Sequence, residues 1–364
     1  MLTAAFAIAL TTLTADAGRA PPPARPITLG VGGDVTLGYH YEEWFDTQVA
    51  KGETRDAMFA WGFSRVKPAV QGADLFVVNL ECPFTARGEK IPKNFNFRAR
   101  PELVAALAAG GVEAVSLANN HLMDYGAQGL FDTLDTLDHS RVLHFGAGRS
   151  LAEARAPLVL ERGGVRLAFL GYFFLGDRNI EPLEVLAAPG KPGVAGDHED
   201  EAKMLRMVKE DIAAARTQAD LVIPFFHWGK EGQHVPEPYQ VRLAHAAIDA
   251  GAAAVFGSHP HVLQGMELYR GAPVLYSLGN FVFGGNWDPK PKDGVLWKGR
   301  FTSAGYQSSE LVPLQTDHYP EAPVQPFVLE GEAGKAVLRH LAEYSTSFEH
   351  PLPELAPYAQ RAKP

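Results

Sequence analysis

The sequence predicts an α/β fold in which mixed β-sheets are flanked by helices. In the first half of the chain, short apolar runs typical of strands alternate with segments of helical periodicity, as in α/β folds. Later, Arg162-Gly163-Gly164 and Arg270-Gly271 each separate two apolar runs and predict hairpins. Together these patterns predict either one mixed sheet or two sheets packed face to face with helices outside.

The expected strands are apolar runs that end in small or polar residues. The first run ends at Asp34 and the second at Asn79. In chain order, the expected strands occupy residues 27–33, 74–78, 112–117, 142–146, 157–160, 165–173, 221–226, 252–256, 266–269, 274–277 and 310–315.

The expected helices are segments of amphipathic period bounded by proline and glycine. One begins with Pro101 in its first turn and stops at Gly110-Gly111, and Gly251 closes another. We interpret the aromatic side chains of residues 39–72, at loose helical spacing, as core packing. Residues 284–308 are rich in Gly, Lys and Pro and predict a long loop that could serve as a lid. The expected helices lie at residues 101–109, 127–137, 199–216, 238–250 and 334–344.

Length and composition exclude several functional classes. The 364 residues suffice for one large domain or two ordinary ones, and the 46% hydrophobic content predicts a well-packed core. The formal net charge of −9 argues against nucleic acid and anionic membranes as partners, because these require a basic surface. Cys82 is the only cysteine, which excludes an intramolecular disulfide and a zinc-finger framework.

The N-terminal segment has the form of a secretory signal. The apolar run Leu2–Leu13 is followed by Ala15-Asp16-Ala17, an A-x-A cleavage pattern, and is too short to span a bilayer. We expect residues 1–20 to be a signal peptide and the protein to be exported or bound to the cell envelope. No Lys or Arg follows Met1, so a cytoplasmic location stays open. Residues 21–26 form a proline-rich linker.

The stretch AAAVFGSHPHVLQ at residues 252–264 carries the strongest local signal. Its apolar start predicts a short buried strand, and Gly257 and Ser258 end that strand. His259 and His261 then flank Pro260, which restricts its own φ and that of His259, so the two imidazoles sit on a stiff turn. Rigid imidazoles at a strand end suit a metal site, although two ordinary turn histidines are an alternative.

Further polar residues follow the ends of other expected strands. In open α/β sheets, ligands bind at this edge. Each residue taken alone could be a turn cap or a satisfied core side chain, but their joint position favours one shared site. The set comprises Asp34, Asn79, Glu81, Asn119, Asn120, His121, His227, His259, His261 and Asn280.

This donor set indicates a divalent transition metal. Carboxylate, amide and imidazole groups suit Zn²⁺, Mn²⁺ or Fe, and fit neither a cysteine site nor a pure oxygen cage for Ca²⁺. Six or seven such ligands exceed the need of one tetrahedral ion. Two ions about 3.5–4 Å apart, bridged by a carboxylate and a water, would use all of them. We therefore expect one or two ions.

Six motifs surround these polar residues, namely GDVTLG (33–38), NLECPFT (79–85), SLANNHLMDYG (116–126), FFHWGKE (225–231), GSHPHV (257–262) and SLGNFVF (277–283). As a set they resemble the motifs of the CapA family, the capsule or poly-γ-glutamate synthesis proteins, which are similar in fold to the calcineurin-like metallophosphoesterases. The resemblance covers roughly residues 27–348 and implies one domain, a four-layer α/β/β/α sandwich, with residues 349–364 as a C-terminal tail.

The resemblance also implies roles for single residues. His121 takes the position of a histidine that donates a proton to a leaving group, and Glu81, with Asn79 nearby, that of a bridging carboxylate. The phosphoesterases carry a histidine at the place of Thr36, so one metal position is short of a ligand. Glu231 could compensate or orient a ligand, and we expect Asn79, Asn119 and Asn280 to support the site. The implied metal ligands are Asp34, Glu81, Asn120, His227, His259 and His261.

The function implied by this resemblance is capsule or cell-envelope polymer metabolism. Lys93, Arg98 and Lys230 could receive an anionic polymer or a phosphorylated substrate, or could be ordinary solvated loop charges. We expect a metal-dependent hydrolase acting on a phosphoester or a γ-glutamyl amide. The alternative is a non-catalytic module that binds an acidic polymer and helps its export in a membrane complex; a plain phosphomonoesterase is a weaker option.

Overall fold

The computed structural model describes residues 25–286, 288 and 290–359. The expected signal peptide at residues 1–20 and most of the linker at 21–26 lie outside the described residues, and their interpretation stays a prediction. Within the described residues, no helix is long and apolar enough to cross a membrane.

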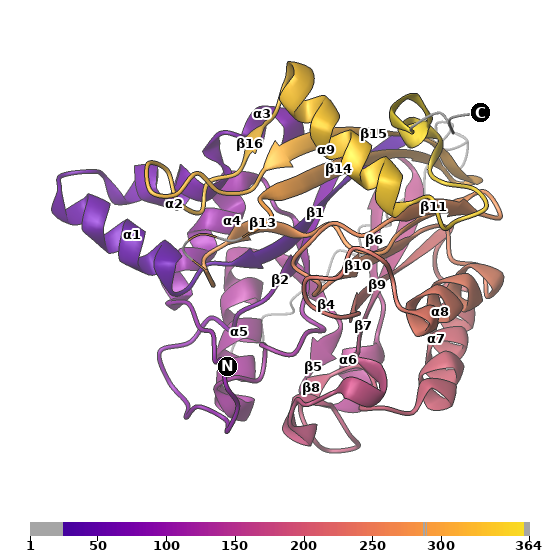
Figure 1. Cartoon of the computed structure of the whole chain (residues 1–364). Helices are drawn as coiled ribbons and strands as arrows, with labels where there is room; N and C mark the ends of the chain where they lie inside the picture. Colours follow the sequence, from indigo (N-terminus) through magenta and orange to yellow (C-terminus); the bar gives the residue numbers. More distant parts are fainter. Residues whose placement is uncertain (1–24, 287, 289, 360–364) are drawn as a thin grey trace, which may run out of the picture.

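The first sheet is mixed and runs in the order β16-β15-β14-β1-β2-β3-β4, with β13 also paired to β1 (Figure 1). Strands β1 to β4 and β13 are parallel, whereas β14, β15 and β16 form an antiparallel meander joined to β1. The bounds are β1 (Ile27–Thr36), β2 (Leu75–Leu80), β3 (Ala114–Ser116), β4 (Leu143–Phe145), β13 (Asn280–Phe283), β14 (Asp293–Thr302), β15 (Gly305–Gln315) and β16 (Phe327–Val328).

The second sheet runs in the order β11-β12-β10-β9-β7-β6. Its four central strands are parallel, and an antiparallel hairpin partner closes each edge, as the two glycine-containing turns predict. The bounds are β6 (Leu158–Arg162), β7 (Val165–Phe174), β9 (Leu221–Trp228), β10 (Val255–Ser258), β11 (Met266–Tyr269) and β12 (Ala272–Leu275). A separate small sheet pairs β5 (Ala147–Gly148) with β8 (Gly193–Val194).

The two sheets pack face to face, and helices cover their outer faces (Figure 1). Because successive side chains of a strand point to opposite faces, Val77 of β2 enters the core between the sheets, whereas Val78 packs under the helices. The helices are α1 (His40–Ala50), α2 (Arg55–Ser64), α3 (Lys67–Val70), α4 (Val104–Gly110) and α5 (Gly126–Ser140) on the first sheet, α6 (Leu151–Arg155), α7 (Glu201–Ala215) and α8 (Pro238–Asp249) on the second, and α9 (Gly331–Tyr344) beside the inter-sheet core. The predicted four-layer sandwich is confirmed.

The prediction of a loop or lid at residues 284–308 is wrong. Strand β14 and the start of β15 occupy most of this segment. Val295 and Trp297 face the inter-sheet core, while Leu296 faces the other side of the sheet. Lys298 pairs with Glu310 across the two strands at 2.8 Å. The many Gly and Lys residues of the segment obscure the alternation of inward and outward side chains that is typical of a strand. Pairing with the neighbouring strands stabilises β14 despite this composition.

Asn280 opens a strand rather than following one. The chain leaves the second sheet after β12, and the next strand, β13, runs parallel to the end of β1 in the first sheet. Gly279, at φ 67°, lies in the turn between β12 and β13. Gly33 allows the close approach, since a Cβ there would lie 1.9 Å from the carbonyl oxygen of Gly279.

The residues that follow position 348 include the 3₁₀ turn η4 (Pro353–Tyr358). Leu352 and Leu355 are buried in the inter-sheet core. The domain boundary at 348 stays a prediction, and the described part of the expected tail packs on the domain.

Candidate metal centre

Strands of both sheets deliver the predicted site residues to one place. Asp34 lies near the end of β1, Glu81 directly follows β2, and the segment 119–121 follows β3. In the second sheet, His227 lies near the end of β9, and His259 directly follows β10. The carboxyl ends of the parallel strands therefore converge, as the sequence pattern predicts.

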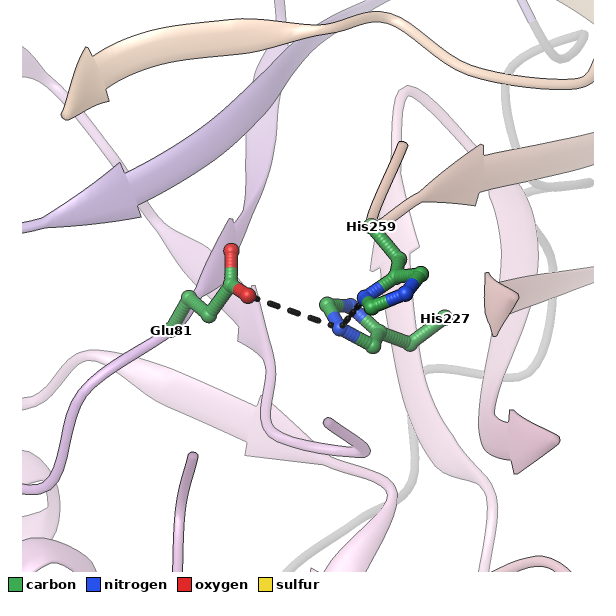
Figure 2. A group of neighbouring side chains, drawn as sticks. All are labelled: Glu81, His227 and His259. Carbon is green, nitrogen blue, oxygen red and sulfur yellow. Dashed lines mark hydrogen bonds and ion pairs between the residues drawn. The ribbon is translucent and has the colours of Figure 1, made fainter. Parts of the chain in front are cut away.

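One group of donors surrounds the Nε2 atom of His227. This atom lies 3.1 Å from His259 Nδ1, 3.5 Å from Glu81 Oε1 and 2.9 Å from Asn120 Oδ1. Figure 2 shows the Glu81 carboxylate and the two imidazoles turned toward one another from separate strand ends. Three of these residues form a cluster whose donor atoms all lie within 4.8 Å, namely Glu81, His227 and His259.

A second group of donors shares Glu81 with the first. His261 Nδ1 lies 3.4 Å from Asp34 Oδ2, and His261 Nε2 lies 3.7 Å from Glu81 Oε1. Asp34, Glu81 and His261 likewise bring donor atoms within 4.8 Å of one another. A further group joins the exposed Glu231 to His259 and His261. Glu81 thus stands between two sets of ligands, where a bridging carboxylate would stand.

The environment of Glu81 fits a cation. The residue is completely buried, and neither carboxylate oxygen has a hydrogen-bond partner among the residues that the structure describes. An ionised carboxylate without such partners costs several kcal/mol to bury. Burial and the neighbouring Asp34 carboxylate raise the pKa of Glu81 well above its ordinary value. A divalent cation between the two donor groups would remove this cost, so the residues present fit a metal.

His227 and His259 are suited to bind a metal as neutral imidazoles. Burial, followed by the neighbouring imidazoles, holds the pKa of His227 and of His259 well below the ordinary value. Neutral imidazoles keep a lone pair for a metal. Burial would also lower the pKa of His261, but the carboxylates of Glu81 and Asp34 outweigh it and raise that pKa to about 10.

Asparagine side chains hold the first ligands in place. Asn79 donates to Asp34 Oδ1 at 2.9 Å, and Asn119 donates to Asn79 Oδ1 at 3.1 Å. Asn119 Oδ1 also accepts from the backbone N–H of His121 at 3.1 Å, which shapes the loop after β3. Asn280 Oδ1 lies 3.0 Å from His261 Nδ1. The contacts place the three asparagines beside predicted ligands, and their supporting role stays a prediction.

The turn that carries the paired histidines is strained and well anchored. His259 and His261 have φ values of 96° and 56°, which non-glycine residues rarely adopt. The backbone N–H of His259 donates to Asp34 Oδ2 at 3.3 Å, and the Pro260 carbonyl accepts from Gly232 at 2.9 Å. A turn is present at Pro260 as predicted, but His259 does not adopt the extended conformation that a following proline favours; its backbone contacts hold it at positive φ instead.

His121 lies beside the ligands with its ring held on two sides. Its Nδ1 is 2.7 Å from Asp124 Oδ2, and the ring stacks on Phe97 at 4.0 Å between centroids. Burial lowers the pKa of His121, and the Asp124 carboxylate opposes this effect. With Nδ1 bound to Asp124, Nε2 is the nitrogen left for proton transfer.

Comparison with known proteins assigns the chain to a family. The family model "Bacterial capsule synthesis protein PGA_cap" matches residues 28–285, which include every predicted metal ligand. This chain belongs to the PGA_cap family. It is 31% identical over 305 residues to the capsule biosynthesis protein CapA of Bacillus anthracis, covering 82% of this chain and 69% of that protein. It is also 31% identical over 316 residues to the PGA biosynthesis protein CapA of Bacillus subtilis, covering 86% and 77%.

Among solved structures, a phosphatase from Mycoplasma pneumoniae matches 80% of this chain and 94% of its own, with a TM-score of 0.46 and 15% identity. A likeness of this extent says nothing about the reaction of the PGA_cap chain.

The three basic side chains that are predicted to bind substrate in this PGA_cap protein lie in different environments. The Lys93 side chain is only 7% exposed, and its ammonium lies 2.9 Å from Asp124 Oδ1 and 2.9 Å from Glu181 Oε2. Arg98 is exposed and stacks over Tyr125 at 4.7 Å, and Lys230 is exposed. Substrate binding by the three stays a prediction, and the contacts of Lys93 give it a role within the site.

Sequence reasoning missed two residues beside the ligands. Asp124 has a faint signal, a carboxylate three positions after His121. Glu181 has none, because it lies in an irregular loop between β7 and β8. Thr36, at the place of the missing histidine, donates its hydroxyl to the Glu81 carbonyl at 3.1 Å.

Proposed function

We propose that this PGA_cap family member is an exported, metal-dependent hydrolase of capsular or poly-γ-glutamate metabolism. The observation that carries the proposal is the buried Glu81 carboxylate, which faces the imidazoles of His227 and His261 and has no hydrogen-bond partner in the described part of the chain. Such a carboxylate is costly unless a cation joins it.

The donor groups fit two divalent ions of Zn, Mn or Fe that share Glu81. When bound, such ions lower the pKa of water toward neutrality and polarise a phosphoryl or carbonyl oxygen. The asparagine supports keep the ligands oriented before metal binds, which limits the entropy lost on binding. The proposed holders are Asp34 and His261 on one side, His227, His259 and Asn120 on the other, and Glu81 between them.

In the proposed reaction, His121 is the general acid. Asp124 accepts from Nδ1 and stabilises the doubly protonated ring, which carries on Nε2 the proton that is transferred. Phe97 stacks on the ring and prevents it from turning away. The leaving alkoxide or amine then takes its proton from His121 rather than from water.

The substrate class follows from the relatives and from bond chemistry. The Bacillus relatives are named for capsule and PGA biosynthesis. A γ-glutamyl polymer offers amide carbonyls for hydrolysis and side-chain carboxylates for recognition. The exposed Arg98 and Lys230 suit these carboxylates, and equally a phosphate group.

The first test is bound metal in protein purified without a metal-affinity tag. We expect about two equivalents of transition metal in the wild type by elemental analysis, and loss of metal in His259→Ala. His350→Ala is the matched control, since the side chain of His350 is 70% exposed. Absence of metal after reconstitution with Zn²⁺, Mn²⁺ and Fe²⁺ would contradict the proposal.

The second test is turnover by the loaded enzyme. Poly-γ-glutamate, a γ-glutamyl anilide and an aryl phosphate separate amide from phosphoester hydrolysis. We expect turnover of one bond class, and its loss in Asn120→Ala and His121→Ala.

A non-catalytic role in polymer export is the second candidate, favoured by Thr36. Its hydroxyl donates to the Glu81 backbone carbonyl. The resemblance to the phosphoesterases implies a histidine at this place, without which one ion position would be one ligand short. Polymer production that is unchanged in cells carrying Asn120→Ala or His121→Ala would support this candidate.

A further inference from the structure

Glu181 contacts the candidate metal centre from a loop outside both sheets. Its Oε1 accepts a hydrogen bond of 3.0 Å from the amide nitrogen of Asn120. Its Oε2 lies 2.9 Å from the ammonium of Lys93, and its side chain is only 12% exposed. The segment between β7 and β8 therefore places a nearly buried carboxylate directly behind a predicted metal ligand.

The loop backbone is organised around Glu181. Asn179 Oδ1 accepts from the N–H of Glu181 at 2.9 Å, and the Asn179 amide donates to the His198 carbonyl at 3.1 Å. The His198 ring Nε2 lies 3.1 Å from the carbonyl oxygen of Glu181. Both backbone polar groups of Glu181 are thus held, although the residue lies outside helix and strand. This anchoring points to a requirement on the position of its carboxylate.

The chemistry of the contact dictates how the Asn120 amide faces. An amide can bind a metal through its oxygen only, because its nitrogen carries no free lone pair. An ionised carboxylate only accepts hydrogen bonds, so Glu181 selects the orientation in which the Asn120 nitrogen faces it. The amide oxygen then faces His227 Nε2, at 2.9 Å. The Lys93 ammonium lies against the Glu181 carboxylate and also donates to the backbone carbonyl of Asn120 at 2.8 Å.

We propose that Glu181 is a positioning residue that holds the Asn120 amide with its oxygen toward the metal. The inference rests on the proposed function, because it takes Asn120 as a ligand. Glu181 itself need not touch the ion or the substrate. Glu181 acts only by fixing the orientation of the Asn120 amide. A side chain at position 181 that can both donate and accept hydrogen bonds would not fix this orientation.

The test is Mn²⁺ affinity of metal-free protein, measured by calorimetry and by the electron paramagnetic resonance of free Mn²⁺. Glu181→Gln keeps the shape of the side chain but lets either face of the Asn120 amide pair with it. We expect Mn²⁺ binding about 10–100-fold weaker in this variant. Glu184→Gln, an exposed position in the same loop, is the matched control and should bind like the wild type. Thermal melting checks that each variant is folded.

A polarity exchange separates positioning from a general structural role. In the double variant Asn120→Asp/Glu181→Gln, the new amide donates to the new carboxylate, whose other oxygen faces the cation. We expect the double variant to bind Mn²⁺ at least about tenfold more tightly than Glu181→Gln alone. Asn120→Asp alone places two carboxylates in contact and should not bind Mn²⁺ more tightly than the wild type. This comparison excludes a simple effect of the added charge.

The outcomes distinguish this inference from the proposed function. Wild-type protein that binds none of Mn²⁺, Zn²⁺ or Fe²⁺ overturns both. Tight binding by the wild type and equal binding by Glu181→Gln overturns the positioning role alone. A double variant no better than Glu181→Gln, or an equal gain in Asn120→Asp alone, also overturns it.

Discussion

Asp34 and Asn280 are register partners on the parallel strands β1 and β13. Both face His261, whose Nδ1 lies 3.4 Å from Asp34 Oδ2 and 3.0 Å from Asn280 Oδ1. Strand β13 thus joins the first sheet at the point where the second sheet delivers its histidines. The pairing of the two strands sets the distance between a carboxylate ligand and the residue that orients an imidazole.

Asn280→Ala should weaken metal binding without unfolding the protein. Asn280 Oδ1 is the closest acceptor for the N–H of His261 Nδ1, which leaves Nε2 free for a metal. Without it the ring can rotate, and we expect an affinity for Mn²⁺ about tenfold lower for one of the two ions. Calorimetric titration measures this, with Asn94→Ala at an exposed position as control. Two ions bound with unchanged affinity would argue against the orienting role.

Gly33→Ala should destabilise the fold at the junction of β1 and β13. An added Cβ would lie 1.9 Å from the carbonyl oxygen of Gly279, which is backbone and cannot turn aside. We expect the free energy of unfolding in urea to fall by about 1–3 kcal/mol. Gly72→Ala is the control, because a Cβ there meets no atom within 4 Å. Equal stability of the two variants would show that β13 is not closely packed on β1.

The convergence of the predicted ligands could be predicted from the sequence. Asp34, Glu81, His227 and His259 each end or follow an apolar run, and the ends of parallel strands meet by geometry alone. The local sequence pattern of each strand shows where that strand ends. Because parallel strands end at the same edge of a sheet, these local patterns also predict which distant residues lie close together.

Other features depend on contacts that no local pattern encodes. Glu181 reaches Asn120 through a loop whose shape depends on Asn179 and His198. Strand β14 is a strand because β1 and β15 pair with it, despite its Gly and Lys content. Such tertiary pairing overrides composition, so the segment was predicted as a loop.

His121→Asn should reduce turnover while leaving metal bound. His121 is placed as the proton donor and is absent from the three groups of metal-site donors within the described residues. We expect kcat to fall about 10²–10⁴-fold. Asp124→Asn should cause a smaller loss, because it keeps the imidazole of His121 and changes the partner of its Nδ1, together with the ion pair of Asp124 with Lys93. The measurement is kcat beside metal content by elemental analysis, and loss of metal in His121→Asn would assign the residue to binding instead.

Asp132 should stabilise the loop that follows Glu81 in a pH-dependent way. It accepts hydrogen bonds from Thr85 at 2.6 Å, from Gln128 at 2.8 Å and from Arg87. Burial alone would raise the pKa of Asp132, but these hydrogen bonds outweigh it and lower the pKa below 3.8. A lowered pKa means that the contribution is present above the ordinary value and is lost as pH falls through the folded-state value.

We therefore expect Asp132→Asn to lower the free energy of unfolding by about 1–2 kcal/mol at pH 7. The difference from the wild type should narrow below about pH 4. Urea unfolding at both pH values measures this, with Glu89→Gln at an exposed position of the same loop as control. A difference that does not change with pH would assign the effect to shape rather than to charge.

Metal removal should lower the melting temperature of the wild-type protein. Metal that binds only the folded chain stabilises it by about 2.7 kcal/mol at a free concentration 100-fold above Kd. For a protein of this size that is a shift on the order of 5 °C. Among the described residues neither oxygen of Glu81 has a hydrogen-bond partner, so without metal the buried carboxylate is balanced less fully, by the His261 imidazole at 3.7 Å. Scanning calorimetry with and without a chelator measures the shift. His259→Ala should melt at the same temperature in both conditions, and His350→Ala should keep the wild-type difference. A wild-type melting temperature that is unchanged by the chelator would contradict stabilisation of the fold by a bound metal.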